Sequence, residues 1–268
     1  MNDHEIDFQI FGEEMQFVEI ELDPYETVIA EAGSFMMKDE EIEMATIFGD
    51  GSQRHDDKGI WGKVLSAGKR LITGESLFLT AFTHGGSGKR KVSFAAPYPG
   101  RIIPLDLSSL RGKIICQKDA FLCAAKGVEV GIEFSKKMGR GFFGGEGFIM
   151  QKIEGDGMAF MHAGGTVVER ELELGEVLHI DTGCLVGFTR EVDYDIEMVK
   201  GVRNMIFGGE GVYYARLQGP GKVWIQSLPF SRLADRVLRS SKNYGRGGSK
   251  GEGSVLGELG NLLDGDNW

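Results

Sequence analysis

A three-residue motif that occurs three times constrains the fold of this chain more than any other feature. Ile42-Glu43-Met44 recurs as Ile132-Glu133-Phe134 and again as Ile196-Glu197-Met198. Self-similarity of this kind is typical of one structural unit that is used several times in a chain. The motif therefore predicts a repeat architecture, although it names no reaction.

A glycine–glutamate turn follows each motif. The glutamates of motif and turn are 13 residues apart in copies two (146 − 133) and three (210 − 197), and 32 apart in copy one (75 − 43). Copy one thus carries a 19-residue insertion, and a later loop in it is 5 residues longer. Without both insertions the first interval between motifs is 66 residues (90 − 24), close to the second interval of 64. The turn residues are Gly74, Glu75, Gly144, Gly145, Glu146, Gly147, Gly208, Gly209, Glu210 and Gly211.

Two roles are open for the turn glutamates Glu75, Glu146 and Glu210. Arranged as a ring, three carboxylates would suit a cation or a basic partner. Alternatively, each carboxylate accepts backbone N–H groups of its own turn, as acidic turn residues commonly do. The repetition favours the second role, because a structural device is copied whenever its unit is copied.

The strand signals predict an all-β fold. In 28–36, 114–122 and 177–185, two apolar runs flank a short polar turn, which is a hairpin signature. A second hairpin is expected to close each unit, for example from Phe148-Ile149-Met150 through a glycine turn to 158–161. Short strands between glycine-rich turns are typical of sandwiches and barrels.

We therefore expect a single all-β body over residues 1–228. It would contain three sandwich repeats, at about 15–95, 100–162 and 165–228. Units of this size are small for independent cores, so we expect them to pack together around a pseudo-threefold axis.

A change of composition marks the end of the β-body. Ser231 is a suitable helix cap before apolar residues at helical spacing, which predicts a helix over 229–241. Residues 242–268 are rich in Gly, Ser and charge and are expected to form a flexible tail. Its spaced leucines, including Leu259 and Leu262, are candidate partner contacts.

The 19-residue insertion is a second candidate contact surface. Trp61 and Leu65 are spaced for one or two helical turns, and lysines flank them. Such a segment is expected to cover an open end of the β-body or to contact a neighbouring subunit. Docking on an anionic membrane surface remains an alternative.

Charge and cysteine content restrict the classes of partner. The net charge of −10 and the pI of about 5.1 argue against nucleic acid, because phosphate contacts need Lys and Arg. The odd set of Cys116, Cys123 and Cys184 has no CxxC spacing and predicts buried thiols in a reducing compartment. We see neither a signal-peptide pattern nor an apolar run of membrane-spanning length, so we expect a cytoplasmic protein.

The triple unit, the turns Phe-Phe-Gly-Gly-Glu-Gly (142–147) and Ile-Phe-Gly-Gly-Glu-Gly (206–211), and the Gly/Leu-rich acidic tail resemble one family. This is the altered-inheritance-of-mitochondria, mitochondrial-biogenesis family, and the resemblance covers about residues 5–230. It implies a TRAP-like fold, a relative of the short double-stranded β-helix, in three copies, and it implies homo-oligomerisation. It supplies no catalytic residues.

No motif assigns catalytic, cofactor or metal-binding residues. The GxGxxG match at 139–144 is flanked by strand signals, whereas a dinucleotide site needs a helix after it. No two histidines have metal-ligand spacing, although His162 and His179 remain able to meet in space. A nucleophile–base pair of Cys184 with His179 also stays open.

We therefore expect a non-enzymatic scaffold or interaction protein that forms a homo-oligomer with no cofactor. The alternative is a small-ligand-binding or enzymatic module with a pocket between repeats. An enzyme should carry titratable residues that break the repeat in one unit. The breaks seen in this chain are loops and insertions instead, which favours the scaffold.

Overall fold

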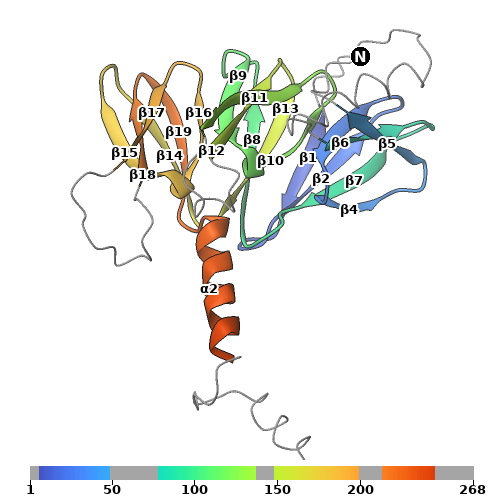
Figure 1. The fold of residues 1–268 in the computed structure, drawn as a ribbon. Coiled ribbons are helices and arrows are strands. Elements are labelled where there is room, and N and C mark those ends of the chain that lie inside the picture. The colour runs from blue at the N-terminus through green and yellow to red at the C-terminus, as the bar shows by residue number, and fades with distance from the viewer. Residues whose placement is uncertain (1–5, 49–77, 137–147, 199–212, 245–268) are drawn as a thin grey trace, which may run out of the picture. The chain divides into compact units, whose positions relative to one another are not determined.

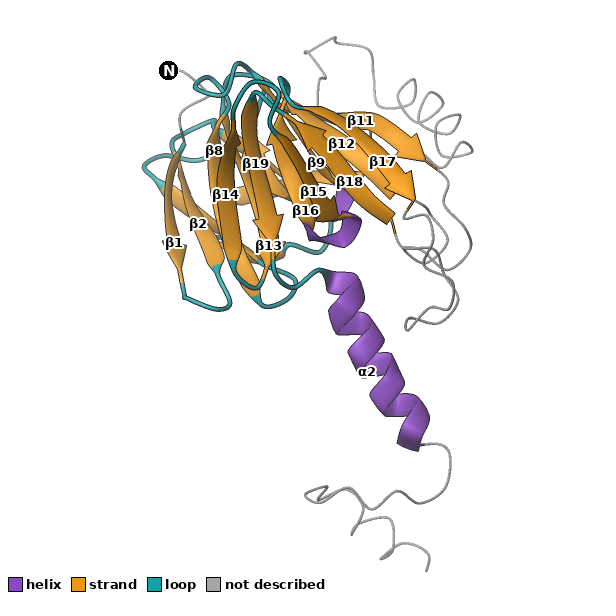
Figure 2. Cartoon of the chain, turned by 90° about the vertical axis from the view of Figure 1, so that its left-hand side faces the viewer, coloured by secondary structure: helices purple, strands orange, loops and turns teal. Residues whose placement is uncertain are grey.

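The computed structural model describes residues 6–48, 78–136, 148–198 and 213–244 of the 268-residue chain. The chain divides into two parts, Met1–Phe230 and Ser231–Trp268. The described residues of the first part are mostly in strands, coloured orange in Figure 2. The prediction of a mostly β protein with a C-terminal helix is confirmed.

The strands form four antiparallel sheets, called A to D here (Figure 1). In order of pairing, sheet A contains β1 (Asp7–Phe11), β2 (Phe17–Leu22), β7 (Arg90–Ala95) and β4 (Phe35–Lys38). Sheet B contains β5 (Ile42–Phe48), β6 (Phe78–His84), β3 (Thr27–Glu31), β10 (Phe121–Ala125), β13 (Met158–Gly164) and β8 (Gly100–Asp106). Sheet C contains β11 (Glu129–Lys136), β12 (Phe148–Glu154), β9 (Lys113–Gln117), β16 (Leu185–Thr189), β19 (Gly221–Gln226) and β14 (Val167–Leu172). Sheet D contains β15 (Val177–Asp181), β18 (Tyr213–Gln218) and β17 (Asp193–Met198).

Three apolar clusters fill the spaces between consecutive sheets. Between sheets A and B, the rings of Phe82 and Phe94 pack edge to face with centroids 5.1 Å apart. Ile114 and Met161 belong to the cluster between sheets B and C, and Phe188 to the one between sheets C and D. Sheets B and C therefore have apolar clusters on both faces, whereas A and D are the end layers.

The three segments expected to fold as opening hairpins do not do so. In 28–36, 114–122 and 177–185, the two strands of each segment lie in different sheets. Short connections, two of them 3-10 turns at Lys118–Ala120 and Thr182–Cys184, carry the chain from one sheet to the next. The prediction was wrong because strands buried on both faces read as continuous apolar runs, which do not reveal the pairing partner.

The predicted closing hairpins are also wrong. Strands β6 and β7, β12 and β13, and β18 and β19 follow one another along the chain but lie in different sheets. The described strands that pair as sequence neighbours are β1 with β2, and, within the three predicted repeats, β5 with β6, β11 with β12 and β17 with β18. The glycine–glutamate turns lie between the members of the three pairs within the repeats in sequence, in 49–77, 137–147 and 199–212, outside the described residues.

The structure does not show the expected packing around a pseudo-threefold axis. The sheets follow one another in the order A to D, and Figure 1 places β4 and β15 at opposite ends of the β-body. Two of the joints between sheet halves are strand pairs, β3 with β10 and β9 with β16. Among the described residues β4 and β15 do not pair with each other, so the succession of sheets stays open and does not close into a threefold.

Helix α2 spans Phe230–Tyr244, where the sequence predicts a helix over 229–241. It begins directly after Pro229, and the preceding strand β19 ends at Gln226. Within the described ranges, no helix combines the length and the apolarity that crossing a bilayer requires.

Candidate functional site

The site residues predicted from the sequence lie outside the described residues. They are Gly74, Glu75, Gly144, Gly145, Glu146, Gly147, Gly208, Gly209, Glu210 and Gly211 in the turns, and Trp61, Leu65, Leu259 and Leu262 as partner contacts. Their roles, including the possible ring of turn glutamates, stay predictions.

The repeated Ile-Glu motifs lie on β5, β11 and β17, each of which is an outer strand of its sheet. Two of their glutamates contact side chains on other strands of the same sheet. Glu133 is 2.9 Å from Lys113 Nζ, and Glu197 accepts a hydrogen bond of 2.8 Å from the hydroxyl of Tyr214. These contacts fit a structural role for the motif on the sheet surface.

The described histidines occupy separate places. His84 ends β6, where its Nε2 lies 2.9 Å from the Gly88 carbonyl and its Nδ1 accepts from Gly86 N–H at 3.3 Å, so it braces a tight turn. His162 lies on β13 of sheet B and His179 on β15 of sheet D. The structure therefore does not bring His162 and His179 onto one sheet as a common site.

His162 is buried beside an aromatic ring. The Tyr98 ring meets it edge to face at a centroid distance of 4.4 Å. Burial lowers the pKa of His162 to about 4, because the charged form would lose its hydration. The imidazole is therefore neutral at physiological pH and serves as a packing element.

A second titratable group, Glu31, ends β3 at the joint between β3 and β10. Burial raises the pKa of Glu31 to about 7, Asp119 raises it further and Lys118 opposes the shift. Gln117 ends β9 at the corresponding joint with β16, and its Nε2 donates to the Thr182 carbonyl at 2.6 Å. A carboxyl group can donate in this way only when it is protonated. Sequence reasoning missed Glu31, whose one signal was an acidic residue inside an apolar run.

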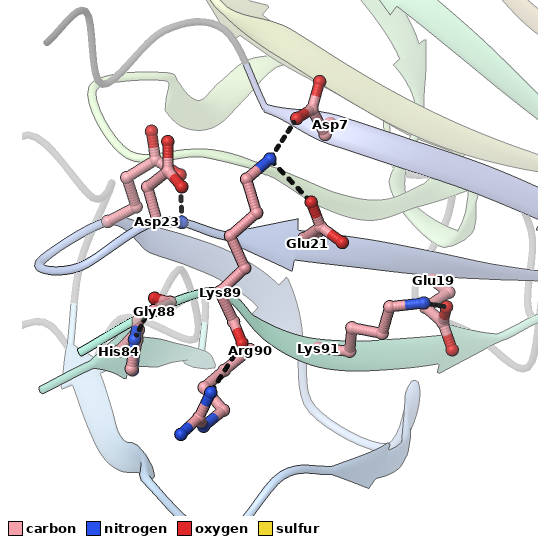
Figure 3. Close-up of polar contacts among 10 residues, drawn as sticks. Asp7, Glu19, Glu21, Asp23, His84, Gly88, Lys89, Arg90 and Lys91 are labelled. Carbon is pink, nitrogen blue, oxygen red and sulfur yellow. Dashed lines mark hydrogen bonds and ion pairs between the residues drawn. The ribbon is translucent and has the colours of Figure 1, made fainter. Parts of the chain in front are cut away.

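The outer face of sheet A carries a ladder of ion pairs, drawn in Figure 3. Lys89 Nζ lies 3.0 Å from Asp7 and 2.6 Å from Glu21, and Lys91 Nζ lies 2.6 Å from Glu19. The hydrogen bonds that Lys89 donates to Glu21 and Asp7 raise the pKa of Lys89 above its usual value. A shallow hollow on this face is lined by Asp7, Phe8, Gln9, Glu19, Glu21 and Lys91. Exposed pairs of this kind contribute little free energy and indicate a solvated face.

The cysteines and acids do not form a metal centre within the described ranges, where no three metal-ligating side chains cluster. Cys116 and Cys123 are buried, as predicted, and burial raises the pKa of both thiols. Cys184 is only half-buried. The raised pKa keeps Cys116 and Cys123 as unreactive thiols, because the thiolate is the nucleophile.

The two end strands, β4 and β15, form the clearest candidate interaction surface. Each is the edge of its sheet. On β4, Phe35, Met36 and Met37 are 40%, 48% and 45% exposed, and Val177 on β15 is 40% exposed. Exposed large apolar side chains on an unpaired edge are typical of an association surface. The Phe-Met-Met run was a weak signal, because the sequence does not say which strands are edges.

Comparisons with known proteins give the family. Residues 8–228 match the family described as Mitochondrial biogenesis AIM24. An uncharacterized protein of Streptococcus pyogenes serotype M6 is 31% identical over 230 residues, which are 84% of this chain and 87% of the relative. An X-ray structure of a protein from Streptococcus pyogenes is 26% identical, with a TM-score of 0.67, and the match covers 88% of this chain and 100% of that one. The resemblance stated from the repeated turns is confirmed: the chain belongs to the mitochondrial biogenesis AIM24 family.

Proposed function

We propose that this protein is a non-enzymatic scaffold or interaction protein of the cytoplasm, built from three copies of one six-stranded unit and working as a homo-oligomer. The observation that carries the proposal is that β4 and β15 each have, among the described residues, one outer edge without a partner strand and exposed apolar side chains. The corresponding strands form the inner joints of the body. The following paragraphs give the support for the repeat and then for association.

The order of strand pairing supports three equivalent units. We take β2–β7, β8–β13 and β14–β19 as the three units. In every unit the sixth strand pairs with the first strand on one side and with the third strand on the other. In a different sheet, the fifth strand of every unit pairs with the fourth strand on one side and with the second strand on the other. Two sheets joined by crossing connections are compatible with the TRAP-like, short double-stranded β-helix expected from the resemblance.

A local irregularity supports the same division. The register of the third strand against the sixth shifts between residues 35 and 37 in the first unit. It shifts between 121 and 123 in the second unit and between 185 and 187 in the third. Bulges at corresponding positions are inherited features of a copied unit.

Association follows from the logic of repeats. Each unit in a repeat array contacts its neighbours through one kind of interface, so the first and last units each retain an unused half of it. Here the unused halves expose apolar side chains on β4 and β15. A further copy of the chain, or a partner that mimics one, would cover them.

Sedimentation velocity of the full chain over a range of concentrations tests this function. We expect species that are multiples of the 29.4 kDa chain. Affinity purification with mass spectrometry would then identify further protein partners. A chain that sediments as a monomer at every concentration, and that recovers no partner, would contradict the proposed function.

A further inference from the structure

Sheets B and C are each composed of two three-stranded halves. In sheet B the half β5-β6-β3 meets the half β10-β13-β8, and in sheet C the half β11-β12-β9 meets β16-β19-β14. Sheet D, β15-β18-β17, corresponds to the first kind of half. In sheet A, β2-β7-β4 corresponds to the second kind, with β1 added at the far edge. The two end sheets are therefore complementary halves of one six-stranded sheet.

Burial along the strands agrees with this correspondence. All residues of β10 and β16 are buried, and so are most residues of β3 and β9. The corresponding end strands differ: three of the four residues of β4 are exposed, and exposed and half-buried residues alternate along β15. The same positions are thus covered in the inner joints and uncovered at the ends.

We propose that β15 of one copy of the chain pairs antiparallel with β4 of the next copy, so that sheets D and A complete one sheet. The partner is a second copy because the pairing repeats, between chains, a joint that each chain already makes twice within itself. This inference rests on the proposed homo-oligomeric function and assigns its interface.

The two inner joints, β3 with β10 and β9 with β16, define the register of the proposed joint between β15 and β4 of two copies. At the first inner joint Ala30 lies opposite Cys123, and at the second Cys116 lies opposite Gly187. Cys123 and Gly187 both come directly after the shift in register on their strands. The two joints therefore have the same alignment.

In the proposed joint, the same alignment places Met37 of one copy opposite Ile180 of the copy that supplies β15. Met37 is the residue that follows the shift in register on β4. Lys38 then lies opposite His179. At the first inner joint Cys123 belongs to the apolar cluster of the preceding unit. By the same geometry, Met37 joins the apolar cluster between sheets C and D, against which Leu178 and Ile180 already pack. Removing these side chains from water supplies the driving force for association.

The joint forms between chains and not within one, because β4 and β15 lie at opposite ends of the β-body in Figure 1. Joining unlike surfaces is a head-to-tail contact, which yields a closed ring if the rotation closes and a filament if it does not. An isologous contact, β4 with β4 or β15 with β15, is a different interface and would contradict the proposal.

Cysteine cross-linking of full-length chains tests the pairing and its direction. Two chains are prepared on a Cys184→Ser background, one with Lys38→Cys and one with His179→Cys. Their mixture, under mild oxidation, should give a disulfide-linked dimer, because directly opposite residues of antiparallel strands are close enough for a disulfide. Each chain alone should give none. A chain carrying both substitutions should give a ladder of linked multimers or a linked ring.

The matched control replaces His179→Cys with Glu171→Cys, an exposed position on β14, which is an edge strand outside the proposed joint. This control should not cross-link with Lys38→Cys. Cross-links in the control mixture, or homotypic cross-links of Lys38→Cys alone, would overturn the head-to-tail assignment. An absence of cross-links in chains that sediment as oligomers would overturn it while leaving the proposed function intact, whereas chains that stay monomeric would overturn both.

A pair of methionine variants gives an independent readout. Met37 is 45% exposed on β4, and Met44 is 48% exposed on β5, away from the joint. Met37→Asp should weaken self-association at least about tenfold, because an unpaired carboxylate would be buried in the joint. Met44→Asp should leave it unchanged, and both variants should keep the circular dichroism spectrum of the parent. Equal effects of the two substitutions would contradict the proposed joint.

Discussion

Replacement of Glu31 by glutamine should change how the stability of this protein depends on pH. Glu31 ends β3 where β3 meets β10, and Gln117 ends β9 where β9 meets β16. Gln117 donates to a carbonyl across its joint. Burial and the nearby Asp119 disfavour the charge of ionised Glu31, so the fold favours its protonated form. Glutamine provides a neutral donor of the same size at every pH.

The sign and size follow from the pKa of Glu31, which burial raises from 4.5 to about 7. The native state holds the proton more tightly than the unfolded chain, so stability is full below about pH 4.5 and falls as the pH rises towards 7. At ~1.36 kcal/mol per pKa unit, the loss reaches at most about 3 kcal/mol and is constant above that range. Glu31→Gln removes this loss and should make the variant more stable than the parent above neutral pH.

Urea denaturation at a series of pH values, followed by circular dichroism, measures this difference. Glu171→Gln, an exposed carboxyl on β14, is the matched control and should leave the difference between acidic and alkaline pH unchanged. If Glu31→Gln and the parent lose stability in parallel between mildly acidic and mildly alkaline pH, the carboxyl is not protonated in the fold. The comparison of Glu31 with Gln117 would then be refuted.

Three further substitutions or truncations have defined outcomes. An added Cβ at Gly187 would lie 2.8 Å from the Ile115 carbonyl oxygen, so Gly187→Ala should destabilise the fold by roughly 1–3 kcal/mol. An added Cβ at Gly85 would meet only the Glu43 carboxylate, at an ordinary contact distance of 3.9 Å, so Gly85→Ala should be nearly neutral in a thermal melt. His162→Phe should flatten the dependence of the unfolding free energy on pH at acidic pH. Burial lowers the pKa of His162 to about 4, so the native state loses stability as the pH falls from 6.5 to 4, and the variant lacks this loss. An unchanged slope at acidic pH would contradict the buried, neutral imidazole. Truncation after Tyr244 should shift the melting temperature by less than ~3 °C, and it should reduce the order of the oligomer or the recovery of partners. A much larger shift would show that residues 245–268 contribute to the stability of the fold.

The sequence predicted the class of fold, because strand and turn signals are local properties of the chain. The Ile-Glu motifs lie on β5, β11 and β17, the outer strands of three sheets. Strand partners are not local. The segment 28–36 holds two apolar strands and a turn whether these pair with each other or, as the structure has it, lie in sheets B and A.

The candidate surfaces were less predictable than the fold. Phe35, Met36 and Met37 read as an ordinary inner strand, and only the sheet order shows that β4 is an edge. Glu31 was hidden for a related reason, since its raised pKa depends on burial and on Asp119, which comes from another part of the chain. Long-range packing determines both properties, and neither composition nor periodicity contains it.

Hydrogen exchange measured as a function of protein concentration tests the central claim most directly. If β15 of one copy pairs with β4 of the next, amides in 35–39 and 177–181 should exchange more slowly as the concentration rises, because paired edges lose contact with water. Amides of the edge strand β14, which has no part in the joint, should exchange at a rate independent of concentration. Protection of β14 instead, or unchanged exchange in β4 and β15 in chains that sediment as oligomers, would contradict the account.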